Sequence, residues 1–250
     1  MIQNAAYARR LEWDGCYNTR DLGGFRTFDG RGTRRHALVR SDNLSRLTDE
    51  GWKALMAYGI RTVLDLRTTW ERTVELSPFL HGENLPVRYV HVPFLTDDRA
   101  LAWPDTSSIE EDYILMLREA RDGIRSIVQA LAHAEDGGIL FYCHSGKDRT
   151  GLIAALVLAM MGVSPDEVAA DYAQSLECLR PLQDEWLENG PGERAEREAA
   201  DAKFASRPET MKIVLQHVDA EYGGVQVYLE NVGVSSADVE RLRGRLIENR

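Results

Sequence analysis

A cysteine and an arginine stand six positions apart in the short segment CHSGKDRTG, residues 143–151. The apolar run GILFY precedes this segment, and an apolar run from Leu152 to Met161 follows it, which predicts a strand, a tight loop and a helix. A loop that enters a helix N-terminus directs several backbone N–H groups at one point and forms an anion site. The same N–H groups and Arg149 would hold the Cys143 thiol as a thiolate. A thiolate and a guanidinium that face one pocket suit attack on a bound phosphate monoester.

The residues expected to bind phosphate are the six that follow the nucleophile: His144, Ser145, Gly146, Lys147, Asp148 and Arg149. A nucleotide-binding loop is the first alternative, but it needs a glycine where Phe141 stands and a hydroxyl residue where Asp148 stands. A cysteine that only packs in the core is the second alternative, and spacing alone leaves it open. The strand–loop–helix context favours the catalytic interpretation.

The segment resembles the signature C-x5-R-[ST] of cysteine-dependent protein tyrosine phosphatases, and more closely the HCxxGKDRTG loop of the bacterial tyrosine/serine phosphatase family. Further stretches are similar to that family: NTRDLGGF at 18–25, LVRS at 38–41, LSRL at 44–47, TVLDLR at 62–67 and VPF at 92–94. The resemblance therefore covers nearly the whole chain. One position differs, because Tyr142 stands where the family usually has histidine.

The resemblance implies catalysis without a metal or cofactor, in which Cys143 takes the phosphoryl group and Arg149 binds its oxygens. Thr150 would hydrogen-bond the sulfur and ease its departure. An aspartic acid must protonate the leaving oxygen. The family places this acid after the VPF stretch, where Asp97 is favoured over Asp98; Asp148, inside the loop, is the competitor.

Three charged residues are expected to support the loop: Arg20, Asp21 and Asp65. On the sequence alone an ordinary salt-bridged turn is the favoured interpretation of Arg20 and Asp21, because surface ion pairs are common. The resemblance shifts both toward a supporting role. Asp65 lies at the end of an expected strand and is also interpreted as a supporting residue.

Composition limits the partners. The chain has 250 residues, 44% of them hydrophobic, and a net charge of −10. This charge argues against general nucleic-acid binding and weakens the case for permanent attachment to an anionic membrane. The six histidines lack metal-ligand spacing, and the three cysteines do not form a disulfide framework. No apolar run is long enough to span a bilayer, and no secretory signal is visible, so a cytoplasmic location is expected, with signal-less export left open.

The pattern of apolar residues predicts an α/β fold: a central, mainly parallel sheet flanked by helices, protein tyrosine phosphatase-like, with a helical C-terminal part. Strands are expected at Ile60–Leu66, Val87–Pro93 and Gly138–Tyr142, with an early hairpin between Phe25 and Val39. Helices are expected at 48–58, at 69–76, along the stripe 109–131 (with Gly123 as an interruption), at 152–161, from 164, and along stripes at 211–218 and 239–246. Ligands of such sheets bind at the carboxyl ends of the strands, where the Cys143 loop falls.

The chain is expected to form a single phosphatase domain, residues 1–250, with a lid or insertion in two places. One is the irregular segment 95–111, and the other is the highly charged segment 178–205. The expected substrate is a phosphotyrosine, and also phosphoserine or phosphothreonine, of a protein. A phosphoinositide is the alternative substrate, since Lys147 adds charge to the loop, and a phosphate-binding module without turnover is a weaker one. The oligomeric state is left open.

Overall fold

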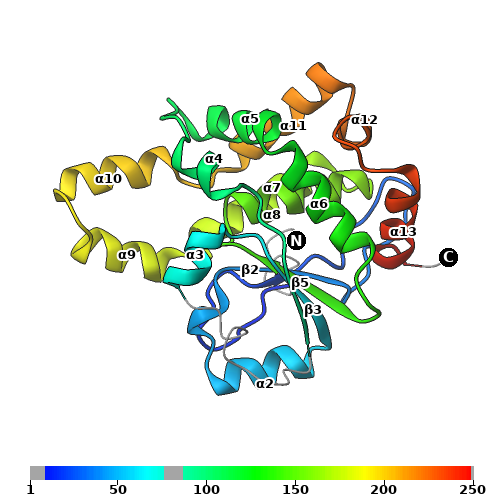
Figure 1. Ribbon diagram of the computed structural model, residues 1–250, viewed down its shortest axis with the longest axis horizontal. Helices are drawn as coiled ribbons and strands as arrows, with labels where there is room; N and C mark the ends of the chain where they lie inside the picture. Colours follow the sequence, from blue (N-terminus) through cyan, green and yellow to red (C-terminus); the bar gives the residue numbers. More distant parts are fainter. Residues whose placement is uncertain (1–8, 76–86, 249–250) are drawn as a thin grey trace.

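A five-stranded sheet lies at the centre of the computed structural model, which describes residues 9–75 and 87–248 (Figure 1). The strands are β1 (Arg20–Asp21), β2 (Leu38–Ser41), β3 (Ile60–Asp65), β4 (Arg88–His91) and β5 (Gly138–Tyr142). Their order is β1-β2-β5-β3-β4; β1 runs antiparallel to β2, and the other neighbouring pairs are parallel. The expected α/β class with a mainly parallel sheet is therefore confirmed.

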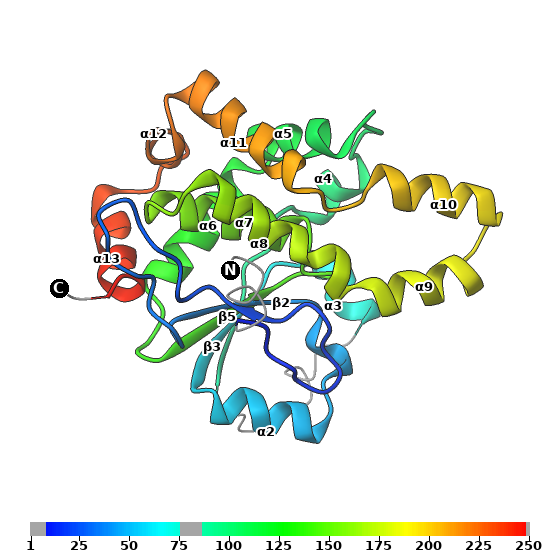
Figure 2. The same ribbon diagram turned by 180° about the vertical axis from the view of Figure 1, so that it is seen from behind.

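Alternate side chains of the strands enter two apolar cores, one on each face of the sheet. Along β5, Ile139 and Phe141 join the larger core, whereas Leu140 and Tyr142 join the smaller one. This alternation follows from the two-residue period of a strand. Helix α2 (Asp49–Ala57) covers the smaller core, and most of the other helices lie on the opposite face (Figure 2).

The remaining helical elements follow in chain order: η1 (Leu44–Arg46), α3 (Thr69–Val74), α4 (Asp97–Leu101), α5 (Ile109–Glu119), α6 (Arg121–Ala132), α7 (Arg149–Met160), α8 (Pro165–Cys178), α9 (Arg180–Asn189), α10 (Arg194–Lys203), α11 (Pro208–Tyr222), α12 (Val225–Asn231) and α13 (Ser236–Leu246). Helix α7 follows the Cys143 loop and is buried on nearly every side. Such burial requires an apolar surface all round, which the run from Leu152 to Met160 supplies.

Some sequence-based expectations are wrong in detail. The early hairpin forms only as a short turn: a bridge joins Arg26 to Gly32, and backbone hydrogen bonds run from Thr27 N to Arg31 O and from Thr33 N to Phe25 O. The expected second strand is shorter, and β2 pairs with β1 and β5. The long stripe 109–131 forms two helices that meet at Ala120. Gly123 lies inside α6, where an added Cβ would come 2.1 Å from the Phe94 carbonyl oxygen, so this glycine permits close packing. Leu76, the expected end of a helix, lies outside the described residues.

Helices α9 and α10 form an arm that projects from the body of the molecule beside α3 (Figures 1 and 2). No residue of α9 is buried, and Arg197 is the buried residue of α10. Most of the segment 178–205 is exposed, as expected, although Cys178 and Leu179 are buried and the segment is helical. Within the described ranges, none of the helices combines the length and the apolar content that crossing a bilayer requires.

Candidate active site

The segment 143–148 forms the loop that joins β5 to α7, at the carboxyl end of the central strand. Cys143 opens it and is 1% exposed. Gly146 has φ +65°, and an added Cβ there would lie 2.4 Å from the Ser41 carbonyl oxygen. Only glycine tolerates both the left-handed conformation and the close approach. The glycine between Cys143 and Arg149 therefore allows the loop to turn tightly against β2.

The loop is held from outside through three consecutive carbonyl groups. The hydrogen bonds run from Asn43 N to His144 O (2.9 Å), from Asn18 Nδ2 to Ser145 O (2.9 Å) and from Arg40 Nη2 to Gly146 O (2.7 Å). In a trans peptide the N–H group points away from the C=O group. The next three N–H groups consequently face the inner side of the loop, as an anion site requires.

A buried cluster of charges holds two of these three donors, Arg40 and Asn18. Asp171 of α8 pairs with Arg40 at 2.7 Å and with Arg20 at 3.3 Å, and the three side chains are at most 1% exposed. Burial raises the pKa of Asp171, but the two guanidinium charges outweigh it and hold that pKa below its usual value. Arg20 also donates to the Asn18 carbonyl oxygen at 3.3 Å. Arg20 thus lies one contact away from the loop.

Asp171→Asn is expected to destabilise the protein by about 3–5 kcal/mol, because it leaves two buried guanidinium groups without a counter-charge. Asp166→Asn on the same helix is the matched control, since the Asp166–Lys212 pair is solvent-exposed and is expected to contribute less than about 1 kcal/mol. Urea unfolding of both variants measures the difference. Equal losses in the two variants would contradict a buried charge cluster under the loop.

Asp21 lies elsewhere. Its carboxylate accepts hydrogen bonds from Gly23 N (2.7 Å), from His36 N (2.8 Å) and from the Tyr58 hydroxyl. These contacts brace the turn after β1. None of them reaches the phosphate loop.

Asp65 contacts the residue that precedes Cys143. Its Oδ2 accepts hydrogen bonds from the Tyr142 hydroxyl at 2.7 Å, from the Tyr89 hydroxyl at 2.8 Å and from Arg67 at 2.8 Å. Burial raises the pKa of Asp65, but Arg67 more than compensates and lowers it overall. Tyr142 is fully buried. Tyr142 stands where the family usually has histidine. It belongs to the smaller core, and the Asp65 carboxylate holds its hydroxyl.

Arg149 is held by a partner that the sequence analysis missed. Its two terminal nitrogens donate to the two carboxylate oxygens of Glu71, at 2.6 and 2.7 Å. Glu71 belongs to the capping box that Thr68 forms at the start of α3. Burial opposes the charge of Arg149, but the hydrogen bonds to Glu71 and the charge of Cys143 raise the pKa of the guanidinium. Arg149 accordingly remains a cation, with its planar fork oriented for a group that carries two oxygens.

Lys147 and Asp148 connect the loop to other parts of the fold. Lys147 Nζ donates to the Phe204 carbonyl oxygen at 2.7 Å, just after α10, and lies 3.4 Å from Asp148 Oδ1. Asp148 Oδ1 also accepts the Tyr113 hydroxyl at 2.7 Å, and that hydroxyl lies 2.9 Å from the hydroxyl of Tyr172. His144 is about half exposed, with its Nδ1 3.2 Å from Glu75 Oε2.

The remaining expected residues differ in their surroundings. The Thr150 hydroxyl is buried and has no hydrogen-bond partner among the described residues. Asp97 and Asp98 lie in the first turn of α4. Asp97 Oδ1 accepts a hydrogen bond from the backbone N–H of Trp70 at 2.9 Å. Asp98 is exposed, and a hydrogen bond with the Thr96 side chain lowers its pKa.

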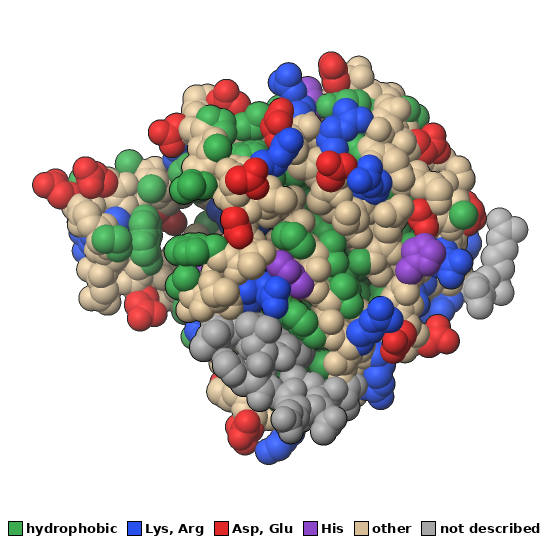
Figure 3. Space-filling view, viewed as in Figure 1, with side chains coloured by type: hydrophobic (Ala, Val, Ile, Leu, Met, Phe, Trp, Pro, Cys, Tyr) green, Lys and Arg blue, Asp and Glu red, His purple; other side chains and the backbone are tan. Residues whose placement is uncertain are grey.

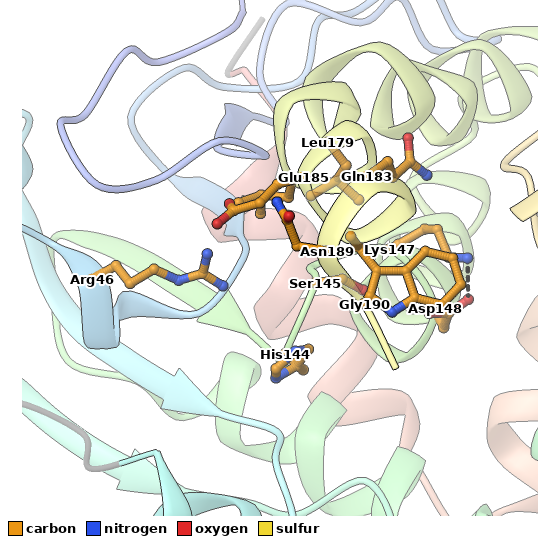
Figure 4. Close-up of a pocket in the computed structure, with 12 residues that line it drawn as sticks. Arg46, His144, Ser145, Lys147, Asp148, Leu179, Gln183, Glu185, Asn189 and Gly190 are labelled. Carbon is orange, nitrogen blue, oxygen red and sulfur yellow. Dashed lines mark ion pairs between the residues drawn. The ribbon is translucent and has the colours of Figure 1, made fainter. Parts of the chain in front are cut away.

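Two cavities flank the loop. One, of about 510 Å³, lies between the loop and α9. Arg46 of η1 lies on one side of it and Lys147 and Asp148 on the other, with Glu185 and Asn189 of α9 between them (Figure 4). The other, of about 760 Å³, contains Arg149 together with residues of α3, α4 and α5. Asp97 lines this second cavity, whereas Asp98 does not.

Several positioning residues emerged only from the structure: Asn18, Arg40, Asn43, Glu71, Tyr113 and Asp171. Asn18 and Arg40 belong to stretches that carried the family resemblance, so a trace of them was present in the sequence. The sequence shows Glu71 as part of a Thr-x-x-Glu capping box. Nothing local distinguishes Asp171 from other helical aspartates, because its partners are more than a hundred residues away.

Comparison with known proteins identifies several similar chains. A tyrosine-protein phosphatase of Nostoc commune is 32% identical over 226 residues, which cover 84% of this chain and 74% of the relative. The triple specificity protein phosphatase PtpB of Mycobacterium tuberculosis is 28% identical over 280 residues and covers 94% of this chain and 98% of its own. The solved structure of TpbA of P. aeruginosa in complex with pTyr covers 75% of this chain and 90% of its own, at 16% identity and a TM-score of 0.30. Residues 11–248 match the tyrosine phosphatase family. This match confirms the expected enzyme class, a protein phosphatase. The chain belongs to the tyrosine phosphatase family.

Proposed function

We propose that the enzyme hydrolyses phosphate monoesters through a cysteinyl-phosphate intermediate. The observation that supports this most directly is the loop itself, in which Cys143 and three inward N–H groups share one site with Arg149. The Cys143 thiolate attacks phosphorus, and the bond from phosphorus to the leaving oxygen breaks while an acid protonates that oxygen. Water then attacks phosphorus, the sulfur–phosphorus bond breaks, and inorganic phosphate leaves.

The binding groups act mainly on the transition state. Loop N–H groups between His144 and Arg149 donate to the equatorial oxygens of the transferring phosphoryl group, and Arg149 binds two of them at once. When substrate binds, the Arg149 guanidinium either replaces its hydrogen bonds to Glu71 by bonds to the phosphate or donates to both groups at once. The buried, unpartnered hydroxyl of Thr150 is available to donate to the sulfur when it leaves as a thiolate.

Asp97 is the proposed proton donor, because it lines the same cavity as Arg149. The alternative is Asp148, which lies inside the loop beside Arg149. Against Asp148, its carboxylate is engaged by Tyr113 and Lys147. Asp98 is the weakest of the three, since it is turned to Thr96.

Leaving-group dependence distinguishes these acids. Loss of the true donor is expected to slow phenyl and alkyl phosphates by about 10²-fold or more, and to spare a substrate with a low leaving-group pKa, such as 4-nitrophenyl phosphate. We expect Asp97→Asn to behave in this way and Asp98→Asn, its neighbour and control, to resemble the parent enzyme. If Asp148→Asn steepens the dependence and Asp97→Asn does not, the acid lies in the loop.

The proposed substrates are phosphotyrosine and also phosphoserine or phosphothreonine in proteins. The names of the two relatives support this range, since one is a tyrosine-protein phosphatase and the other a triple specificity protein phosphatase. A phosphoinositide is the alternative, supported by Arg46 and Lys147 beside the loop. Hydrolysis of phosphotyrosine and phosphoserine peptides, measured against a phosphoinositide panel, separates these substrates, and the absence of any turnover would leave a phosphate-binding module.

We further propose that residues 1–250 act as one cytoplasmic phosphatase domain. In this proposal the arm of α9 and α10 and the segment 95–111 act as lids beside the loop. The contact from Lys147 to the end of α10 supports the first, and Asp97 on the wall of the Arg149 cavity supports the second.

A further inference from the structure

The cavity that contains Arg149 has an unusual lining for a site that receives phosphate. Its walls are mainly apolar and include Trp70, Leu101, Trp103 and Met116. Leu101 is 91% exposed and Trp70 is 64% exposed. Hydrophobic side chains gather on this part of the surface, over α3 and α4 (Figure 3). Large apolar side chains that remain in water beside a reactive group indicate a surface that a partner covers.

A carboxylate also lines this cavity. Asp112 of α5 is about half buried and accepts the neutral indole N–H of Trp103 at 2.7 Å. It forms no ion pair with a described residue. The nearby Lys147 and Lys203 donate to the carbonyl oxygens of Phe204 and Thr106 instead. Burial raises the pKa of Asp112, although the charges of Lys147 and Lys203 lower it in part.

The chemistry of the missing occupant follows from these two features. An apolar wall with one unpaired carboxylate suits a side chain that has a long aliphatic stem and a cationic head. Arginine fits best, because its guanidinium can also stack on an indole ring. A membrane of anionic lipid is the other kind of surface that exposed apolar groups can meet. The carboxylates of Asp97 and Asp112 on the cavity wall and the net charge of −10 oppose it.

We propose that this cavity binds a lysine or arginine side chain that lies close to the phosphorylated residue of a protein substrate. The inference rests on the proposed function, since Arg149 in the same cavity marks the position of the phosphate. Asp112 and Arg149 line the same cavity, so the basic residue lies within a few positions of the phosphorylated one. Asp112 then selects among phosphoproteins, while the loop carries out the reaction.

The test compares phosphotyrosine peptides that are identical except for arginine, alanine or glutamate at each of the three positions on either side. We expect kcat/KM for the best arginine peptide to exceed that for the matching glutamate peptide by about tenfold. Asp112→Asn, which keeps an oxygen for the Trp103 indole, is expected to reduce this ratio to about twofold. Leu101→Ser should lower kcat/KM for all the peptides. Asp105→Asn, an exposed carboxylate outside the cavity, is the matched control and should keep the full ratio.

Hydrolysis of 4-nitrophenyl phosphate separates this inference from the function on which it rests. We expect Asp112→Asn and Leu101→Ser to change that activity by less than about twofold, because the small substrate does not extend from Arg149 to these two side chains. Intact 4-nitrophenyl phosphate turnover, with no preference for arginine at any position, would overturn the inference alone. Binding of the parent enzyme to phosphatidylserine vesicles that Leu101→Ser abolishes would also overturn it. Failure to hydrolyse any phosphate ester would overturn the proposed function.

Discussion

Cys143→Ser is expected to reduce turnover by at least about 10³-fold and to leave the binding of inorganic phosphate within a few-fold of the parent enzyme. The serine hydroxyl is a much weaker nucleophile than a thiolate. The anion site survives, because its N–H groups and its fixing bonds from Asn18, Arg40 and Asn43 are unchanged. Steady-state kinetics and phosphate titration monitored by NMR measure the two quantities.

Cys16→Ser is the matched control for this substitution. Cys16 is also a free thiol, but burial raises its pKa to about 12, so it is not a ready nucleophile. Its replacement should leave kcat within about twofold of the parent value. Substantial activity in Cys143→Ser would exclude a covalent cysteinyl mechanism. Loss of phosphate binding as well as turnover would instead show that the thiol holds the loop together.

Arg149→Lys is expected to lower kcat/KM nearly as much as Arg149→Ala, by about 10²-fold or more in each case. Lysine keeps the charge but loses the planar fork that holds two oxygens at once. The structure displays that fork in its contact with Glu71, where both terminal nitrogens donate to one carboxylate. The binding of a phosphoryl group requires the same geometry.

Arg88→Lys is the control for Arg149→Lys. Arg88 lies on β4 and forms an exposed ion pair with Glu135, so this substitution should leave kcat/KM unchanged. Near-native kcat/KM in Arg149→Lys would show that a positive charge alone is sufficient. A lysine variant that fails to fold would be recognised by circular dichroism. In that event, Glu71→Gln tests whether loss of the orienting carboxylate raises KM or lowers kcat.

The sequence was sufficient to predict the strand, loop and helix that carry Cys143 and Arg149, because their pattern lies in consecutive residues. Cys143 and Arg149 flank a glycine between a short apolar strand and an apolar helix, and each of these features is local. The mainly parallel sheet was predictable for the same reason. Short buried strands separated by helices leave few other arrangements.

Arg20 and Asp65 were expected to support the site, but most of the other supports were not predictable, because they arise from contacts between distant segments. Asp171 meets Arg20 and Arg40 across more than 130 residues of sequence. Local patterning also gave the wrong positions of some elements. Gly123 predicted an interruption, yet tertiary packing against Phe94 places it inside a helix. The charged segment 178–205 was predicted to be exposed, but its composition did not reveal that it forms two helices.

The central claim is that the phosphoryl group passes through Cys143. Its most direct test is rapid acid quenching of the enzyme with a phosphotyrosine peptide during the first turnover, followed by proteolysis and mass spectrometry. The account predicts one added phosphoryl group on the peptide that contains Cys143, formed at least as fast as steady-state turnover and absent from Cys143→Ser. A phosphoryl group on another side chain, or full turnover with no phosphoenzyme at any time point, would contradict it.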